Sequence, residues 1–201
     1  MDFSNINLIT LLASLMVAST PILLAATGEL VAERAGVLNL GVEGMMITGS
    51  VVGFMAAIGV NNLTCVDSWA LCGLATAIGP NNLGFAAAAA GGAGMALLFA
   101  LLTQFLLSNQ VATGLALTLF GLGLSALLGQ GYLGEVAPGI DKMPIPGLNQ
   151  IPYIGPVLFS HDAVVYLSLL LVAGVWAVLK FTRFGLVLRA VGENHEAAHA
   201  L

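Results

Sequence analysis

Long stretches without any charged side chain are the feature that most constrains how this chain can fold. After Glu43 the next charge is Asp67, none then follows until Glu135, and a further charge-free run separates Asp162 from Lys180. A charge at the centre of a bilayer costs roughly 3 kcal/mol on insertion scales. Charged residues make up only 7% of the chain, whereas a soluble domain carries about 25%. Lipid rather than water is therefore expected to face most of this chain.

Five segments are long and apolar enough to cross a membrane as helices, which takes about 20 residues each. They predict an all-α fold, a polytopic transmembrane helix bundle that forms a single domain over residues 1–201. The predicted spans are Leu8–Ala26, Val37–Ile58, Leu83–Leu107, Val111–Gly129 and Ala163–Leu179. A sixth apolar stretch, Trp69–Gly79, is too short to span and is typical of a re-entrant or interfacial piece.

The distribution of lysine and arginine predicts the orientation of these spans. Three of the five basic residues follow the last span and mark that end as cytoplasmic: Lys180, Arg183 and Arg189. Counting back through five spans places Arg34 on the same side. The N-terminus then lies outside, together with residues 60–82 and 130–162. The protein is thus expected to be a multi-pass protein of the cell membrane.

The segments placed outside carry two further signals. Five of the seven prolines lie within residues 130–162, and because proline breaks helices this stretch is expected to be a structured external loop. Cys65 and Cys72 lie in the other external segment, where thiols are oxidised, which predicts a disulfide between them. Two buried thiols that act as small apolar residues remain the alternative.

Sequence patterns that carry enzyme chemistry are absent. The chain has no GxxxxGK[ST] phosphate loop, no CxxC pair, no clustered metal ligands and no GxSxG nucleophile motif. Neither a catalytic activity nor a cofactor or metal is therefore expected. The net charge of −5 and the lack of a basic stripe argue against nucleic-acid binding. Transport or a structural role in the membrane remains.

The run GELVAERAGVLNLGVEGMM (residues 28–46) places polar groups beside apolar segments. The start of the second span is interrupted by residues that disfavour a regular helix: Asn39, Gly41 and Gly44. Interrupted helices at membrane depth occur where they line a cavity or are buried in protein. This predicts Asn39 and Glu43 beside a substrate pathway. The alternative is a short cytoplasmic turn over Glu29–Arg34, with Glu43 at the membrane edge.

Two more stretches flank spans on the cytoplasmic side. In SNQVATG (residues 108–114), Asn109 and Gln110 are predicted to contact substrate or a neighbouring helix, and a polar turn that caps two helices is the alternative. In residues 181–201, Gly192 is predicted to end one helix. Asn194 is predicted to begin another, with Glu196 in its first turn favouring the helix dipole.

Four ordered motifs that together cover most of the chain resemble those of a known family, the permease subunits of bacterial ABC importers. The likeness is to the branched-chain amino acid/ribose permease superfamily, and within it to the nucleoside (simple-sugar) branch. The motifs are GELVAERAGVLNLGVEGMM (residues 28–46), NQVATGLALTLFGLGLSALLG (109–129), PIPGL (144–148) and LRAVGENHEAAHAL (188–201). Residues 61–82, which contain both cysteines, look longer than is usual in the family.

The resemblance implies a role in ATP-driven import of nucleosides or related small polar solutes. It implies three partners in the lipid bilayer or beside it: a second homologous permease subunit, a cytoplasmic ABC ATPase and an extracytoplasmic substrate-binding lipoprotein. Residues 180–201 would form the cytoplasmic segment that couples to the ATPase. The residues matched there are Arg189, Gly192, Glu193, Asn194, Glu196, Ala197 and Ala198. Family members continue for several more helices, so the C-terminal part is expected to be missing.

Two other function classes fit a membrane bundle. An ion-coupled secondary transporter would need ionisable residues near the middle of the membrane, and the last three predicted spans have none. A non-transporting structural subunit of a membrane complex would need no such residues. Copurification separates the three, because an ATPase partner is expected only for the ABC permease.

Overall fold

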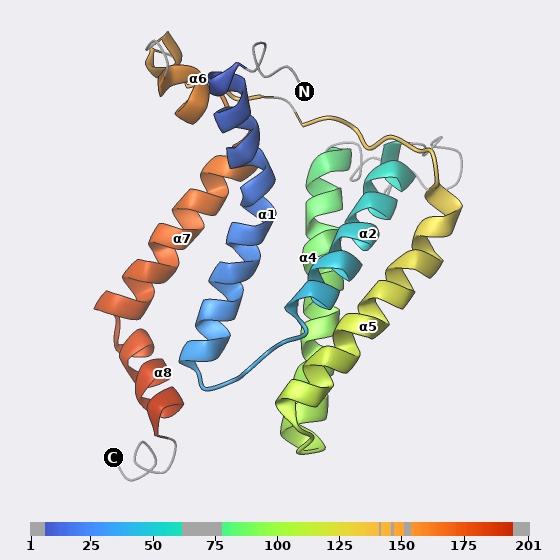
Figure 1. Cartoon of the computed structure of the whole chain (residues 1–201), viewed down its shortest axis with the longest axis vertical. Coiled ribbons are helices and arrows are strands. Elements are labelled where there is room, and N and C mark those ends of the chain that lie inside the picture. Colours follow the sequence, from blue (N-terminus) through green and yellow to red (C-terminus); the bar gives the residue numbers. More distant parts are fainter. Residues whose placement is uncertain (1–6, 62–77, 141, 146, 151–153, 195–201) are drawn as a thin grey trace. The chain divides into compact units, whose positions relative to one another are not determined.

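The computed structural model describes residues 7–61, 78–140, 142–145, 147–150 and 154–194, and helices form nearly all of its regular structure there (Figure 1). Five of these helices are long and apolar enough to cross a membrane. They are α1 (Leu8–Arg34), α2 (Val42–Asn61), α4 (Pro80–Ala100) continued by the π-helical turn η2 (Leu101–Phe105), α5 (Gln110–Gly129) and α7 (Ala163–Phe181). This confirms the predicted all-α polytopic bundle.

Shorter helices complete the description. They are the 3-10 turns η3 (Gln130–Tyr132) and η4 (Leu148–Gln150), and the α-helices α6 (Ile154–Leu158) and α8 (Arg183–Glu193). The external loop predicted over residues 130–162 thus contains short helical pieces. Within the described part of this loop, a single antiparallel β-bridge pairs the backbone of Lys142 with that of Asp162. The predicted disulfide partners Cys65 and Cys72 lie outside the described residues.

The first two spans differ from their predicted boundaries. Helix α1 continues to Arg34 instead of ending near Ala26, because Glu, Leu, Ala and Arg are all strong helix formers. The alternative of a short turn over Glu29–Arg34 is therefore wrong. Helix α2 begins at Val42 and not at Val37, so Asn39 and Gly41 precede the helix. The prediction that Gly44 also interrupts it is wrong, because Gly44 lies in the first turn of α2.

The chain divides into two compact units, residues 1–37 with 140–201, and residues 38–139. In the first unit α1 lies beside α7, with α6 near the start of α1 and α8 near its end (Figure 1). Both long helices therefore run in the same direction. Helix α8 turns off α7 at Thr182, whose hydroxyl donates to the carbonyl of Val178 at 2.6 Å and accepts from the Gly185 N–H at 3.1 Å.

In the second unit α2 packs antiparallel to α4 and parallel to α5 (Figure 1). Glycines stand where these helices come closest. A Cβ built on Gly53 would come within 2.7 Å of the Gly84 carbonyl oxygen, and one on Gly44 would come within 2.6 Å of the Leu117 carbonyl oxygen. Small residues at such crossings let helix backbones approach closely in a membrane.

The register of α2 against α4 determines which ends lie together. Gly53 meets Gly84 near the start of α4, whereas Gly92, further along α4, has the carbonyl oxygen of Met45 as its neighbour. The end of α2 and the beginning of α4 are therefore at the same end of the pair. Most of the predicted re-entrant or interfacial stretch Trp69–Gly79 lies outside the described residues.

Candidate functional site

Helix α2 begins part of the way along its neighbours and not at their ends. Gly41, just before α2, faces Gly114, which lies one turn or about 6 Å past the start of α5. On α4, Gly92 lies beside Met45 and stands roughly 20 Å before the end of η2 at Phe105. The first turn of α2 thus lies within the length spanned by α4, η2 and α5, and the non-helical residues Leu38–Gly41 lead into it. A substrate pathway beside this helix start stays a prediction.

Side chains satisfy the backbone of the extended segment Leu38–Gly41. The Leu38 N–H donates to Oε1 of Gln110 at 2.9 Å, and the Gly41 N–H donates to Oδ1 of Asn39 at 3.0 Å. The hydroxyl of Thr118 donates to the Leu40 carbonyl oxygen at 3.1 Å. Non-helical backbone at membrane depth needs such partners, because no water is available there.

The turn between η2 and α5 is held by its own polar residues. Asn109 caps α5, where its Oδ1 accepts from the N–H groups of Val111 and Ala112 at 3.0 and 3.3 Å. Ser108 donates to the Leu102 carbonyl oxygen and lies 2.8 Å from the Thr113 hydroxyl oxygen. Asn109 and Gln110 thus make the hydrogen bonds of a capping turn. Contact with a substrate stays a prediction for both.

Of the four predicted pathway residues, Asn39, Glu43 and Gln110 border the start of α2, and Asn109 is next to Gln110. Glu43 is exposed in the first turn of α2, where a carboxylate interacts favourably with the helix dipole. Asn39 is half-buried and its Nδ2 lies 3.5 Å from Sδ of Met45. The structure therefore gathers these side chains at one end of the second unit.

A cavity of about 480 Å³ lies between α4 and α5 in the same unit, mostly lined by apolar side chains. Its polar groups come from Ser108 and Thr113, and its apolar walls include Leu98, Leu102 and Phe120. Sequence reasoning did not single out Ser108, Thr113 or Thr118 as individual residues. Ser108 and Thr113 lie in the SNQVATG motif, and Thr113 and Thr118 lie in the family-like motif of residues 109–129.

The second group of predicted residues lies at the end of α8 in the other unit. Arg189 donates from Nε to the Gly185 carbonyl oxygen at 3.3 Å. Helix α8 continues through Gly192 to Glu193, and Asn194 ends it with its N–H on the Ala190 carbonyl oxygen at 3.1 Å. The prediction that Gly192 ends this helix is therefore wrong. Glu196, Ala197 and Ala198 lie outside the described residues.

Gly192 lies inside α8, and its lack of a side chain lets the helix pack closely against the turn that ends α1. After α1 the chain makes a Schellman turn, in which the N–H groups of Gly36 and Val37 donate to the carbonyl oxygens of Glu33 and Ala32, both at 3.0 Å. Gly36 has a φ of +81°. A Cβ on Gly192 would come within 2.9 Å of the Gly36 nitrogen and closer still to the Arg34 carbonyl oxygen.

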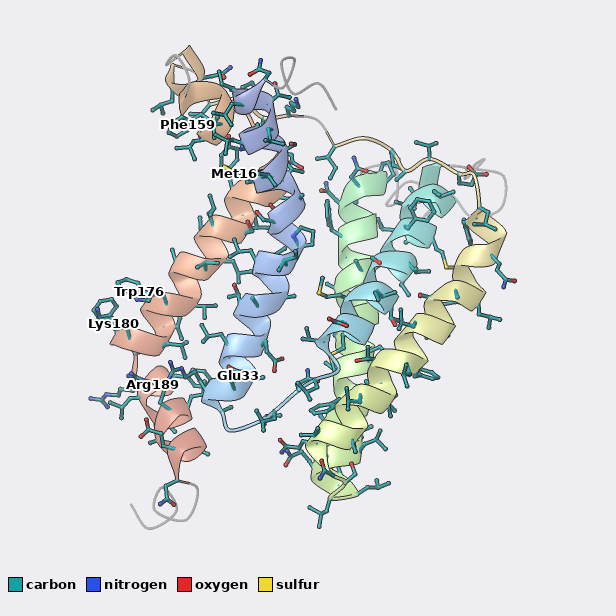
Figure 2. The ribbon with its side chains drawn as sticks, viewed as in Figure 1. Met16, Glu33, Phe159, Trp176, Lys180 and Arg189 are labelled. Atoms are coloured by element: carbon teal, nitrogen blue, oxygen red, sulfur yellow. The ribbon has the colours of Figure 1, made fainter. Side chains whose placement is uncertain are left out.

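Basic residues collect at this same end of the first unit, at the end of α1, at the end of α7 and on α8. Lys180 lies over the rings of Trp176 and Phe181, with its Nζ 4.9 and 5.5 Å from the two ring centroids. Figure 2 shows Trp176 and Lys180 together at the end of α7, with Arg189 nearby on α8. Tryptophan with a basic residue is typical of a membrane–water interface.

Comparison with known proteins matches nearly the whole chain to one family. The family model described as branched-chain amino acid transport system / permease component matches residues 11–201. A putative glucose ABC transporter permease protein of Haloferax volcanii is 40% identical over 195 residues, which cover 95% of this chain and 54% of that protein.

Two bacterial relatives are similar over the same region. The guanosine ABC transporter permease protein of Bacillus subtilis is 31% identical over 210 residues, covering 100% of this chain and 61% of its own length. The nucleoside ABC transporter permease protein of Lactococcus lactis is 31% identical over 196 residues, covering 95% and 58%. The chain thus spans little more than half the length of these curated relatives. No solved structure matches it.

Proposed function

The chain belongs to the family of branched-chain amino acid transport system permease components, and on that premise we propose that it is the membrane-spanning permease subunit of an ATP-driven importer. Nucleosides or related small polar solutes are the substrates. The observation that carries this proposal is the family match over residues 11–201, together with relatives named for guanosine and nucleoside transport. A relative named for glucose keeps simple sugars as the second substrate class.

The broken start of α2 supports a substrate pathway in this subunit. Three of the predicted pathway residues, Asn39, Glu43 and Gln110, border this helix start, beside close glycine contacts. The permease changes the affinity of the pathway between outward-facing and inward-facing states and does no bond chemistry. Energy comes from a cytoplasmic ABC ATPase, and substrate is delivered by an extracytoplasmic lipoprotein. A second homologous permease subunit completes the pathway.

The collected charges of the first unit support an orientation with the N-terminus outside. Arg34, Lys180, Arg183 and Arg189 belong to the end shared by α1, α7 and α8, whereas Lys142 lies near the start of α7, where its backbone forms a β-bridge with that of Asp162. Cysteine labelling tests this in cells. A cysteine at Met143, which is 63% exposed, should react with an impermeant reagent, and one at Phe184, 66% exposed, should react only after permeabilisation. The reverse pattern would overturn the orientation.

The same orientation supports the disulfide between Cys65 and Cys72, since both would face an oxidising compartment. Mass spectrometry of the non-reduced protein tests it. A linked pair is expected, and two free thiols would remove the proposal.

Residues 180–201 couple the permease to its ATPase in this proposal, with the small residues Ala197 and Ala198 entering a groove on the partner. A charge there should prevent docking and leave the membrane bundle intact. Ala198→Glu in the full-length protein is therefore expected to reach the membrane normally and to lose ATP-driven uptake. Uptake at the native rate with normal membrane levels would show that this segment does not dock.

Transport by the assembled proteins is the decisive experiment. The full-length protein is reconstituted in vesicles with its ATPase, second permease and receptor lipoprotein, and uptake of labelled guanosine is measured with glucose as a parallel substrate. Uptake that requires ATP supports the proposal, and the preferred solute decides the substrate class. Uptake driven by an ion gradient without ATP would favour a secondary transporter, and no uptake of either solute would favour a structural subunit.

Within the described spans, charged residues stand in the last two turns of α1, the first turn of α2 and the last turn of α7. A secondary transporter is expected to carry ionisable groups near the membrane centre. Helices α4 and α5 carry no charged residue and α7 carries one only in its last turn, which favours the ATP-driven importer over that alternative.

A further inference from the structure

The end of α8 meets the end of α1 through backbone alone. A Cβ on Gly192 would come within 2.9 Å of the Gly36 nitrogen and 3.0 Å of the Arg34 carbonyl carbon. From the other side, a Cβ on Gly36 would stand 3.2 Å from the Gly192 Cα. Real Cβ atoms rarely come this close to backbone, which cannot yield as a side chain does.

Both partners in this contact are held from within their own elements. Gly36 is the left-handed residue of the Schellman turn, so its position follows from the hydrogen bonds that end α1. Gly192 lies about two turns after Gly185, which is buried against the end of α7. Helix α8 is thus attached to α7 at its beginning and to α1 at its end.

Because α8 is packed at both ends, a force applied at its C-terminal end would act on the contact between Gly192 and the end of α1. The last residue of α8, Glu193, leads directly into residues 194–201, the part of the coupling segment 180–201 that contains Ala197 and Ala198 and enters the ATPase under the proposed function. A displacement of that segment would move Gly192, and the close contact leaves no compressible side chain to absorb the displacement. Val37 alone then separates the turn of Gly36 from Leu38, whose N–H is bound by Gln110 at the approach to α2.

We propose that Gly192 and Gly36 are positioning residues that form the joint through which the coupling segment moves α1 and the start of α2. The inference rests on the proposed function, because it needs an ATPase that moves the segment. The contact requires glycine on both sides. A side chain added at either position should separate α8 from α1. ATP hydrolysis by the partner would then no longer drive movement of the substrate pathway.

Two variants test the joint in the full-length, assembled transporter. Gly192→Ala places a Cβ against the backbone of the turn. Gly36→Asn tolerates the left-handed conformation but adds a Cβ at 3.2 Å from Gly192. The matched controls are Gly28→Ala on α1 and Gly134→Asn, whose φ is +92°, because a Cβ at either position has no neighbour within 4 Å.

The measured quantity is solute taken up per ATP hydrolysed, with the amount of assembled complex determined alongside. In both joint variants this ratio should fall by about tenfold or more, within the usual range of coupling between sites, while ATP hydrolysis continues. Both controls should keep the native ratio. A loss of coupling with hydrolysis intact is not expected from a residue that serves only to fold the protein.

An unchanged ratio in both joint variants would overturn the inference. Where Gly192→Ala does not assemble, the milder Gly36→Asn decides alone. Failure of both to assemble would show that the contact serves folding only, which also overturns it. Failure of the proposed function is distinguished by the native protein, which would then show no ATP-driven uptake at all.

Discussion

The two compact units pack their helices in different ways. In the second unit α2 meets α4 and α5 through glycines, and a Cβ added at several of them would fall within 3 Å of a neighbouring backbone. In the first unit α1 and α7 leave an apolar groove of about 390 Å³, lined by residues such as Val31, Leu171, Gly174 and Val178. Close glycine contacts occur in that unit only at the short helix α6 and at the two ends of α8 among the described residues.

Some of these close contacts lie at backbone that the proposed function uses. In the second unit Gly41 meets Gly114 and Gly44 meets Leu117 at the start of α2. In the first unit the corresponding contacts hold α8, the helix that leads into the coupling segment. In the groove, which α8 also lines through Phe184 and Leu188, the Cβ position of Gly174 has no neighbour within 4 Å. Four substitutions test this difference, from the largest expected effect to the smallest.

The largest effect is expected for Gly121→Ala on α5. The new Cβ would lie 2.6 Å from the carbonyl oxygen and 2.7 Å from the Cα of Gly44, so one helix has to move. Overpacking of this kind costs about 3 kcal/mol. Thermal denaturation of the purified protein in detergent measures it. Gly123→Ala on the same helix is the control, since its Cβ has no neighbour within 4 Å; equal stability of the two variants would contradict the packing argument.

A smaller loss of stability is expected for Gln110→Ala, which removes the acceptor for the Leu38 N–H. Loss of a hydrogen bond of this kind costs up to about 1.5 kcal/mol, and the segment Leu38–Gly41 should loosen. Hydrogen exchange of residues 38–41 and thermal denaturation report the two consequences. Gln110→Glu keeps an acceptor oxygen and should behave more like the native protein. Unchanged exchange in Gln110→Ala would show that this bond does not hold the segment.

Thr182→Ala, at the corner between α7 and α8, is expected to lower the stability of the protein by a smaller amount. The variant loses both hydrogen bonds of the hydroxyl, one to Val178 and one from Gly185. Loss of a helix cap costs about 1 kcal/mol. Thr182→Ser keeps the hydroxyl and serves as the control. If the alanine and serine variants denature at the same temperature, the cap makes no contribution to α8.

The smallest effect, and of opposite sign, is expected for Gly174→Ala on α7. Its Cβ would meet nothing within 4 Å, so only the intrinsic preference of alanine for helix acts, worth roughly 0.5 kcal/mol of added stability. The same thermal assay measures it against Gly121→Ala. Destabilisation by Gly174→Ala comparable with Gly121→Ala would remove the difference between the two units.

The number of spans and the all-α class could be predicted from the sequence alone. So could the placement of Arg34 at the same end of the spans as the basic residues that follow the last span. Lipid excludes charge, so the positions of a few charges and the lengths of the runs between them carry this information directly. The interruption before α2 could also be predicted, because Asn39 and Gly41 disfavour a regular helix. Its partners could not, since the bonds of Leu38 to Gln110 and of Leu40 to Thr118 join segments far apart in the chain.

The tertiary structure alone decided which glycines matter. Gly121 and Gly123 are two residues apart in the same apolar helix, and nothing in their local sequence distinguishes them. Gly121 lies against the backbone of Gly44, whereas Gly123 has no neighbour within 4 Å of its Cβ position. The same holds for Gly192, which was predicted to end a helix and instead packs inside one. A glycine has no side chain, so its sequence signal is the same whether it breaks a helix or lets another backbone approach.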